Sequence, residues 1–167
     1  MDVLIRDMKE EDYIFVSEIY SQGIKTKCAT FQTEIPSYED WDKAHLKYCR
    51  LVAVNEENTI LGWAALSPTS SRCVYKGVAE VSVYISEEFR GRKIGSILMN
   101  DIIDRSETFG IWTLQSSIIE RNKSSIELHK KSGFRMVGFR ENIAQDVDGN
   151  WQNTVLFERR SDKIGIC

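Results

Sequence analysis

Residues 80–96 read EVSVYISEEFRGRKIGS, and this stretch determines how the rest of the chain is interpreted. Its first half alternates between apolar and polar residues, with Val81, Val83 and Ile85 on the apolar side, which is the period of a strand with one buried face. A basic turn with two glycines follows, and apolar residues then recur at near-helical spacing over 94–109. The stretch therefore predicts a strand, a basic turn and an amphipathic helix.

The turn between the strand and the helix has the composition of a phosphate site. The start of a helix leaves backbone N–H groups without partners and carries a partial positive charge, and both favour an anion. Gly91 and Gly95 let the backbone approach a ligand closely, while Arg90, Arg92 and Lys93 add formal charge. Taken alone, the turn is equally compatible with an ordinary solvated connection.

This unit resembles the acetyl-CoA signature of the GNAT acetyltransferases, Arg/Gln-x-x-Gly-x-Gly/Ala. Arg90 and Gly95 match its two ends, and Lys93 stands where the family usually has the middle glycine. The spacing matches neither a Walker-type phosphate loop nor a dinucleotide-binding fingerprint.

A second part of the family pattern lies farther along the chain. It consists of an Asn, a small residue, an apolar residue, a Tyr or His, and Gly-Phe. Here these residues are Asn122, Ser125, Leu128, His129, Gly133 and Phe134. The resemblance implies acetyl-CoA as the cofactor. The residues expected to bind it are Val83, Tyr84, Ile85, Arg90, Gly91, Arg92, Lys93, Ile94, Gly95, Ser96, Asn122 and Ser125.

Bulk composition limits the remaining possibilities. The chain has 167 residues, is 42% hydrophobic and carries a formal net charge of −3, so we expect one domain, residues 1–167, and no nucleic-acid partner. No run is long and apolar enough to span a bilayer, and the amino terminus does not look like a signal peptide, so we expect a cytoplasmic protein without a membrane partner.

The cysteines give no sign of a metal centre. No Cys-x-x-Cys pair occurs among the four cysteines, which are Cys28, Cys49, Cys73 and Cys167. The chain has only two histidines that could complete a zinc site with them. We interpret them as reduced thiols and expect no metal site.

The order of patterns along the chain defines a fold. Strands are expected at residues 3–6, 51–54, 60–66, 80–85, 113–119, 134–146 and 151–159, the last two joined by an Asp148-Gly149 turn. Helices are expected from residue 9 to 24, 37–48, 94–109 and 124–132, with an unpatterned loop over 25–34. With the GNAT resemblance this implies an α/β (α+β) fold, a mixed central sheet of about seven strands flanked by about four helices.

A narrower resemblance runs nearly end to end. The chain is similar to phosphinothricin N-acetyltransferases and to their relatives that acetylate methionine sulfoximine and sulfone. The shared marks are Phe31-x-Thr33-Glu34, Arg72-x-x-Tyr75, Glu80-x-x-Val83-Tyr84 and Gly149-x-Trp151. Val147 and Asn153 depart from the family, which commonly has a basic residue and an Asp there.

This resemblance implies a small amine or amino-acid substrate, bound by Phe31, Thr33, Glu34, Arg72 and Tyr75. An Arg fork suits a carboxylate or phosphinate, although Arg72 is also compatible with a plain surface charge. The family usually forms homodimers, and we expect the contact at the last hairpin.

The reaction requires a base, because an alkyl amine is largely protonated at neutral pH. Glu80 lies on the polar side of the central strand, and its position matches the base proposed in the resembled enzymes. The alternative is a carboxylate on a solvated sheet face.

The reaction also requires oxyanion stabilisation and a proton for the departing thiolate. Main-chain N–H groups near Tyr84 and Ile85 suit the oxyanion if the strand is splayed there. For the thiolate we consider His129, which is equally compatible with a packing or cofactor-contact role.

Two classes of function stay open. One is an N-acetyltransferase acting on a small amino acid or analogue, with protein amino termini and polyamines as rival acceptors. The other is a domain that binds acyl-CoA without turnover. Glu80 favours the enzyme, because a pure sensor needs the basic turn but not the carboxylate.

Overall fold

A single twisted sheet organises the protein in a computed structural model that describes residues 2–166. Its seven strands run in the order β1-β2-β3-β4-β5-β7-β6. They are β1 (Leu4–Asp7), β2 (Leu51–Val54), β3 (Ile60–Pro68), β4 (Val78–Ile85), β5 (Thr113–Ile119), β6 (Arg135–Gln145) and β7 (Trp151–Arg160). All neighbours are antiparallel except β4 and β5, so the expected mixed sheet is confirmed.

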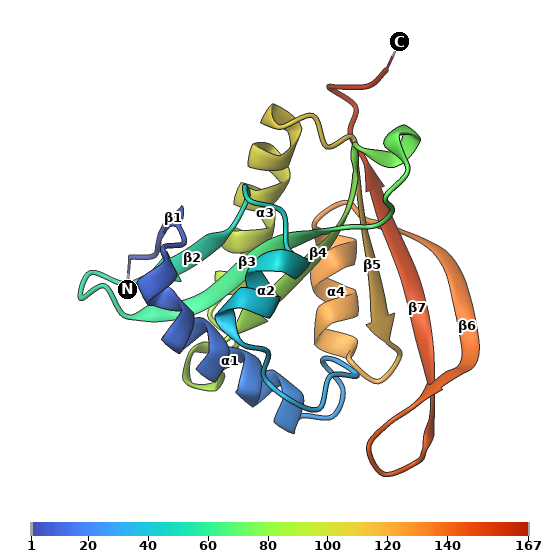
Figure 1. Ribbon diagram of the computed structural model, residues 1–167, viewed down its shortest axis with the longest axis horizontal. Coiled ribbons are helices and arrows are strands. Elements are labelled where there is room, and N and C mark those ends of the chain that lie inside the picture. The colour runs from blue at the N-terminus through green and yellow to red at the C-terminus, as the bar shows by residue number, and fades with distance from the viewer. Residues whose placement is uncertain (1, 167) are drawn as a thin grey trace.

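Helices cover the sheet on both faces (Figure 1). They are α1 (Tyr13–Lys25), α2 (Tyr38–Ala44), α3 (Ile94–Thr108) and α4 (Lys123–Lys131). One core joins α3 and α4 to the sheet through Leu98, Ile102 and Ile126, and a smaller core beneath α1 and α2 contains Val16 and Trp41. None of the helices within residues 2–166 is long and apolar enough to cross a membrane.

The alternation predicted for the central strand decides which side chains face which core. On β4, Val81 is buried with α3, whereas Tyr84 packs against the core beneath α1 and α2. Because side chains alternate along a strand, Glu80 and Ser82 share the face of Tyr84. The carboxylate therefore lies on the α1–α2 side of the sheet.

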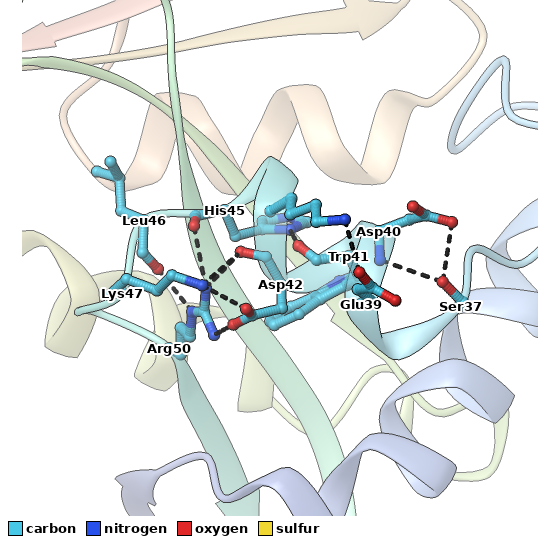
Figure 2. A network of polar contacts seen from close by, with 10 residues as sticks. Ser37, Glu39, Asp40, Trp41, Asp42, His45, Leu46, Lys47 and Arg50 are labelled. Atoms are coloured by element: carbon cyan, nitrogen blue, oxygen red, sulfur yellow. Dashed lines mark hydrogen bonds and ion pairs between the residues drawn. The ribbon is translucent and has the colours of Figure 1, made fainter.

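The second helix is shorter than its sequence pattern indicates. Residues 37–48 were expected to be helical, but α2 ends at Ala44 and His45 is already extended, with ψ 150°. The side chain of Arg50 explains this end, because it donates hydrogen bonds to the carbonyl oxygens of Asp42, His45 and Leu46 (Figure 2). Carbonyls that a longer helix would have used internally are satisfied by this arginine instead.

The cysteines that the structure describes are unpaired. Cys28, Cys49 and Cys73 are free thiols, and Cys167 lies outside the described residues. Burial raises the pKa of Cys49 to about 12. Within residues 2–166, no group of three or more His, Cys, Asp and Glu side chains is placed to hold a metal ion.

Candidate active site

Within residues 2–166, the one parallel strand pair of the sheet opens into a fork. β4 and β5 are paired at three positions, of which the last places Glu80 opposite Gln115. Beyond it, residues 81–85 of β4 stay paired with β3, and residues 116–119 of β5 stay paired with β7. We call these two diverging strand ends the fork. The splay that the oxyanion prediction required is therefore present, and Glu80 lies where it begins.

Main-chain groups of β4 point into the fork at alternate residues. The N–H of Ser86 donates to the carbonyl of Leu61 in β3 at 2.9 Å, which fixes the alternation of this antiparallel ladder. Because of this alternation, the N–H and C=O groups of Tyr84 point toward β3, and those of Val83 and Ile85 point into the opening between β4 and β5. Of the two N–H groups expected to meet an oxyanion, that of Ile85 is available and that of Tyr84 is used within the sheet.

Glu80 has the environment of a proton acceptor. Its side chain is half-buried and accepts no hydrogen bond from another residue in the part of the chain that the structure describes. Burial raises the pKa of its carboxyl group, and the positive charge of Arg140 opposes the rise. A carboxylate with a raised pKa is a stronger base than one in water.

The basic turn presents unused N–H groups at the start of α3. Gly91 and Lys93 both have positive φ, at 77° and 65°. The N–H groups of Ser96 and Ile97 bond to the carbonyl of Lys93, while among the described residues those from Gly91 to Gly95 have no partner. The Arg90 side chain reaches back to the carbonyl of Ile85 at 3.4 Å, which joins the turn to the fork. Unused N–H groups at the start of a helix suit a phosphate group, and binding of the coenzyme A pyrophosphate by this turn stays a prediction.

Asn122 and Ser125 shape the other side of the fork. Asn122 caps α4, because its side-chain oxygen accepts the N–H of Ser125 at 3.1 Å and the hydroxyl of Ser124. Its amide NH₂ donates to no other described residue and remains available. Cofactor contact by Asn122 and Ser125 stays a prediction.

His129 is held in one tautomer on the buried face of α4. Its Nδ1 lies 2.7 Å from the carbonyl oxygen of Ser125, which only accepts, so Nδ1 carries the proton. Nε2 then presents a lone pair, and it is buried without a partner among the described residues. Burial lowers the pKa of His129, whose ring meets Phe134 edge-on at 4.9 Å. Proton donation by His129 stays a prediction, and it requires the imidazole to be protonated first.

Tyr84 connects the fork to the loop between α1 and α2. Its hydroxyl donates to the carbonyl of Ala29 at 3.5 Å, and its ring stacks on Trp63 at 4.8 Å. The ring also lies against Gly23, where an added Cβ would come within 2.8 Å. Helix α1 can approach the strand this closely only because Gly23 has no side chain.

Two of the residues predicted to bind substrate line a cavity of about 210 Å³ beside this loop. These two residues are Phe31 and Thr33. Val147, where the family commonly has a basic residue, lines the cavity from the β6–β7 hairpin. Glu34 is exposed and is not part of the lining. The full lining consists of Ile24, Lys25, Lys27, Thr30, Phe31, Gln32, Thr33, Asp146 and Val147.

The other two predicted substrate residues lie at the opposite end of β4. Arg72 and Tyr75 belong to the exposed turn before β4, with the guanidinium 5.7 Å from the ring centroid. Figure 1 shows this green segment far from the connection between α1 and α2. The structure therefore places the two predicted groups on either side of Glu80 rather than in one cluster, and their roles stay predictions.

Sequence reasoning missed the hairpin and loop residues that build the cavity. Lys27 and Thr30 sit in the unpatterned loop, and Asp146 stands at the end of the strand expected over residues 134–146, far from that loop in the chain. Val147, as an apolar residue in a hairpin tip, was the one available signal.

Comparison with known proteins agrees with this architecture. Residues 10–134 match the model of the Acetyltransferase (GNAT) family. A putative phosphinothricin acetyltransferase of Bacillus subtilis is 32% identical over 149 residues, covering 87% of this chain and 91% of the relative. An L-methionine sulfoximine/L-methionine sulfone acetyltransferase of Pseudomonas aeruginosa is 25% identical over 167 residues, covering 97% and 96%. The crystal structure of a GNAT superfamily phosphinothricin acetyltransferase from Sinorhizobium meliloti in complex with AcCoA superimposes with a TM-score of 0.85 at 26% identity, covering 96% and 89%.

Proposed function

This chain belongs to the GNAT family of acetyltransferases and is an acetyl-CoA-dependent N-acetyltransferase, and from that premise we propose that its acceptor is a small amino acid or a close analogue. Relatives named for phosphinothricin and for methionine sulfoximine and sulfone support this acceptor class. The single observation that carries the proposal is the position of Glu80, half-buried where the fork begins.

The fork and the basic turn each have a task in such a reaction. Acetyl-CoA supplies an acetyl group activated as a thioester. Glu80 accepts the proton that the acceptor ammonium must lose, and burial makes its carboxylate a better base for this. The N–H groups of Val83 and Ile85, open to the fork, donate to a carbonyl oxygen that gains negative charge. The N–H groups of Gly91 to Gly95 hold phosphate at the start of α3.

The cavity beside the fork is suited to a compact acceptor. Its walls combine the apolar side chains of Ile24, Phe31 and Val147 with the hydroxyls of Thr30 and Thr33. A volume of about 210 Å³ accommodates an amino-acid side chain. Arg72 is not part of this lining and lies at the other end of β4.

The acceptor class is tested by mixing the protein with acetyl-CoA and a panel of amines and following free thiol release. The panel contains phosphinothricin, methionine sulfone and sulfoximine, the standard amino acids, spermidine and an alanine-initiated peptide. We expect release with amino acids or their analogues above the other two classes. Release with spermidine or the peptide alone would reject the acceptor class. Tight acetyl-CoA binding without release would favour a sensor.

We also propose that two copies associate through the β6–β7 hairpin. Strand β6 forms one edge of the sheet, and large apolar side chains gather along this hairpin with exposed fractions of 43% to 59%. We call them the apolar strip: Met136, Val137, Phe139, Ile143 and Trp151. Such a strip on an unpaired edge favours self-association. Light scattering should give twice the chain mass for the wild type and the single mass for Phe139→Glu, and a monomeric wild type would reject the dimer.

A further inference from the structure

Three segments that are distant in sequence meet at Arg121. The first is residues 26–33, which we call the strap. The second is the tip of the β6–β7 hairpin, and the third is the segment just after β5, to which Arg121 belongs. Its Nη2 donates to the carbonyl of Lys27 at 2.9 Å and lies 3.7 Å from the carboxylate of Asp146. Lys27 in turn pairs with Asp148 at 2.6 Å.

These contacts lie around the cavity that we assign to the acceptor. The strap supplies Thr30, Phe31 and Thr33 to one wall, and the hairpin supplies Asp146 and Val147 to the other. Hydrogen bonds from Asn150 above all lower the pKa of Asp146, which keeps it ionised as a partner for Arg121. The separation of the two walls is therefore set by a charged contact.

The strap is tied to both strands of the fork. The carbonyl of Ala29 accepts from the side chain of Tyr84 of β4, and the carbonyl of Lys27, two residues earlier, accepts from Arg121, which lies two residues beyond the end of β5. Loss of the Arg121 bond would leave only the Tyr84 bond of this pair.

These contacts set local geometry and add little to the stability of the whole fold. The side chains of Lys27, Asp148 and Arg121 are 51%, 53% and 53% exposed, and exposed ion pairs contribute little to global stability. The strap carries one internal cost, because Lys27 has a positive φ of 55° without being glycine. The bond from Arg121 to the carbonyl of this same residue helps to hold that conformation.

We propose that Arg121 is a positioning residue for the acceptor: it ties the strap to the end of β5 and to the hairpin tip, and so fixes the separation of the two cavity walls. This rests on the proposed function, in which that cavity receives the acceptor. Arg121 itself contacts neither the acceptor nor the reacting atoms. Its loss should weaken acceptor binding while the chemistry of a bound acceptor continues.

The test compares the full-length wild type with Arg121→Gln, Arg121→Lys and the control Arg105→Gln. Arg105 also joins distant segments, pairing with Asp7 of β1 and Asp101 of α3, but it lies away from the cavity. Arg121→Gln should raise the acceptor KM about five- to tenfold, with kcat and the acetyl-CoA KM within about twofold of the wild type. Arg121→Lys should recover part of the loss, because an ammonium can still reach Asp146, and Arg105→Gln should leave the acceptor KM unchanged.

Hydrogen exchange of the strap gives a readout that does not depend on activity. Amides in residues 27–32 should exchange about fivefold faster in Arg121→Gln than in the wild type or in Arg105→Gln. Unchanged exchange, or an acceptor KM equal to that of the wild type, would overturn the proposal. If no amine in the panel is acetylated, the proposed function fails, and the exchange experiment still decides whether Arg121 holds the strap.

Discussion

The end of α2 and the fork are both rich in polar groups, but they use them in opposite ways. At the end of α2, Arg50 donates to the carboxylate of Asp42 at 2.6 Å and to three carbonyl oxygens, of Asp42, His45 and Leu46, at 2.6 to 3.0 Å. Its guanidinium also lies 5.1 Å from the ring centroid of Trp41. Figure 2 shows that this network closes on itself within one short stretch of chain.

The fork and the basic turn after β4 leave their polar groups open. The N–H groups from Gly91 to Gly95 and the carboxylate of Glu80 find no partner in the described residues. For Glu80, which is half-buried, the lack of a partner costs free energy in the fold, whereas Gly91, Arg92 and Lys93 are exposed and their N–H groups are open to water. We therefore expect mutations in the Arg50 network to change the stability of the fold, and mutations in the fork and the basic turn to change ligand binding and the reaction rate. Mutations in each region can test that separation.

The largest effect is expected from Glu80→Gln. Without a base, kcat/KM should fall roughly 10²–10⁴-fold. Stability should not fall with it, because burial raises the pKa of Glu80 and so makes the ionised form the less favourable one in the fold. A group with a raised pKa stabilises the fold only below its unfolded pKa and loses that contribution as pH rises through its folded pKa. At pH 7.5 the glutamine variant should therefore unfold at the same temperature as the wild type or higher.

The pH dependence of the rate separates a base from a structural carboxylate. The wild-type rate should fall as the pH drops through the raised pKa of Glu80, and the variant should lack this acidic limb. Thiol release across a pH series measures both. A Glu80→Gln variant with full activity at neutral pH would remove Glu80 from the mechanism.

The second largest effect is expected from Arg50→Met, on stability alone. The substitution leaves the carbonyls of His45 and Leu46 without this donor and removes one of the donors to Asp42, to which Lys47 still donates, at a cost of about 2–3 kcal/mol. For a chain of this length that corresponds to a Tm lower by roughly 5–10 °C. At a temperature where the variant is folded, kcat/KM should match the wild type. A loss of activity in the folded variant would contradict the separation between the two regions.

The sequence predicts well what depends on neighbouring residues. The alternation of residues 80–85 and the helical spacing after Ile94 give β4 and α3, whereas phosphate binding by the glycines and arginines between them stays a prediction. The length of α2 was overestimated because the side chain that ends it, Arg50, lies beyond the helix. The cavity could not be predicted, because it depends on contacts such as Lys27 with Asp148, which are 121 residues apart.

A smaller effect is expected from Gly91→Val. Gly91 has a φ of 77° and nothing within 4 Å of an added Cβ, so the substitution changes backbone conformation without a clash. A β-branched residue resists this φ, and the displaced N–H groups should raise the acetyl-CoA KM about tenfold. Gly110→Val is the matched control, with a φ of 79°, equal space and a position outside the fork. Equal acetyl-CoA KM values for the two variants would argue against phosphate binding by the turn.

The smallest effect concerns Lys93, whose charge and backbone conformation can be separated. Lys93 has a φ of 65° just before α3, a conformation that costs a non-glycine residue about 1 kcal/mol. Lys93→Gly and Lys93→Ala remove the same charge, but only glycine also removes the strain. In thermal unfolding, the free energy of unfolding of the glycine variant should exceed that of the alanine variant by up to about 1 kcal/mol. The difference is limited because the greater entropy of glycine in the unfolded chain offsets part of the gain. Both should weaken acetyl-CoA binding by the same factor, about two- to fivefold at low salt and less at high salt. If binding followed the backbone instead, the two variants would differ, and Lys93 would act through the shape of the turn rather than through its charge.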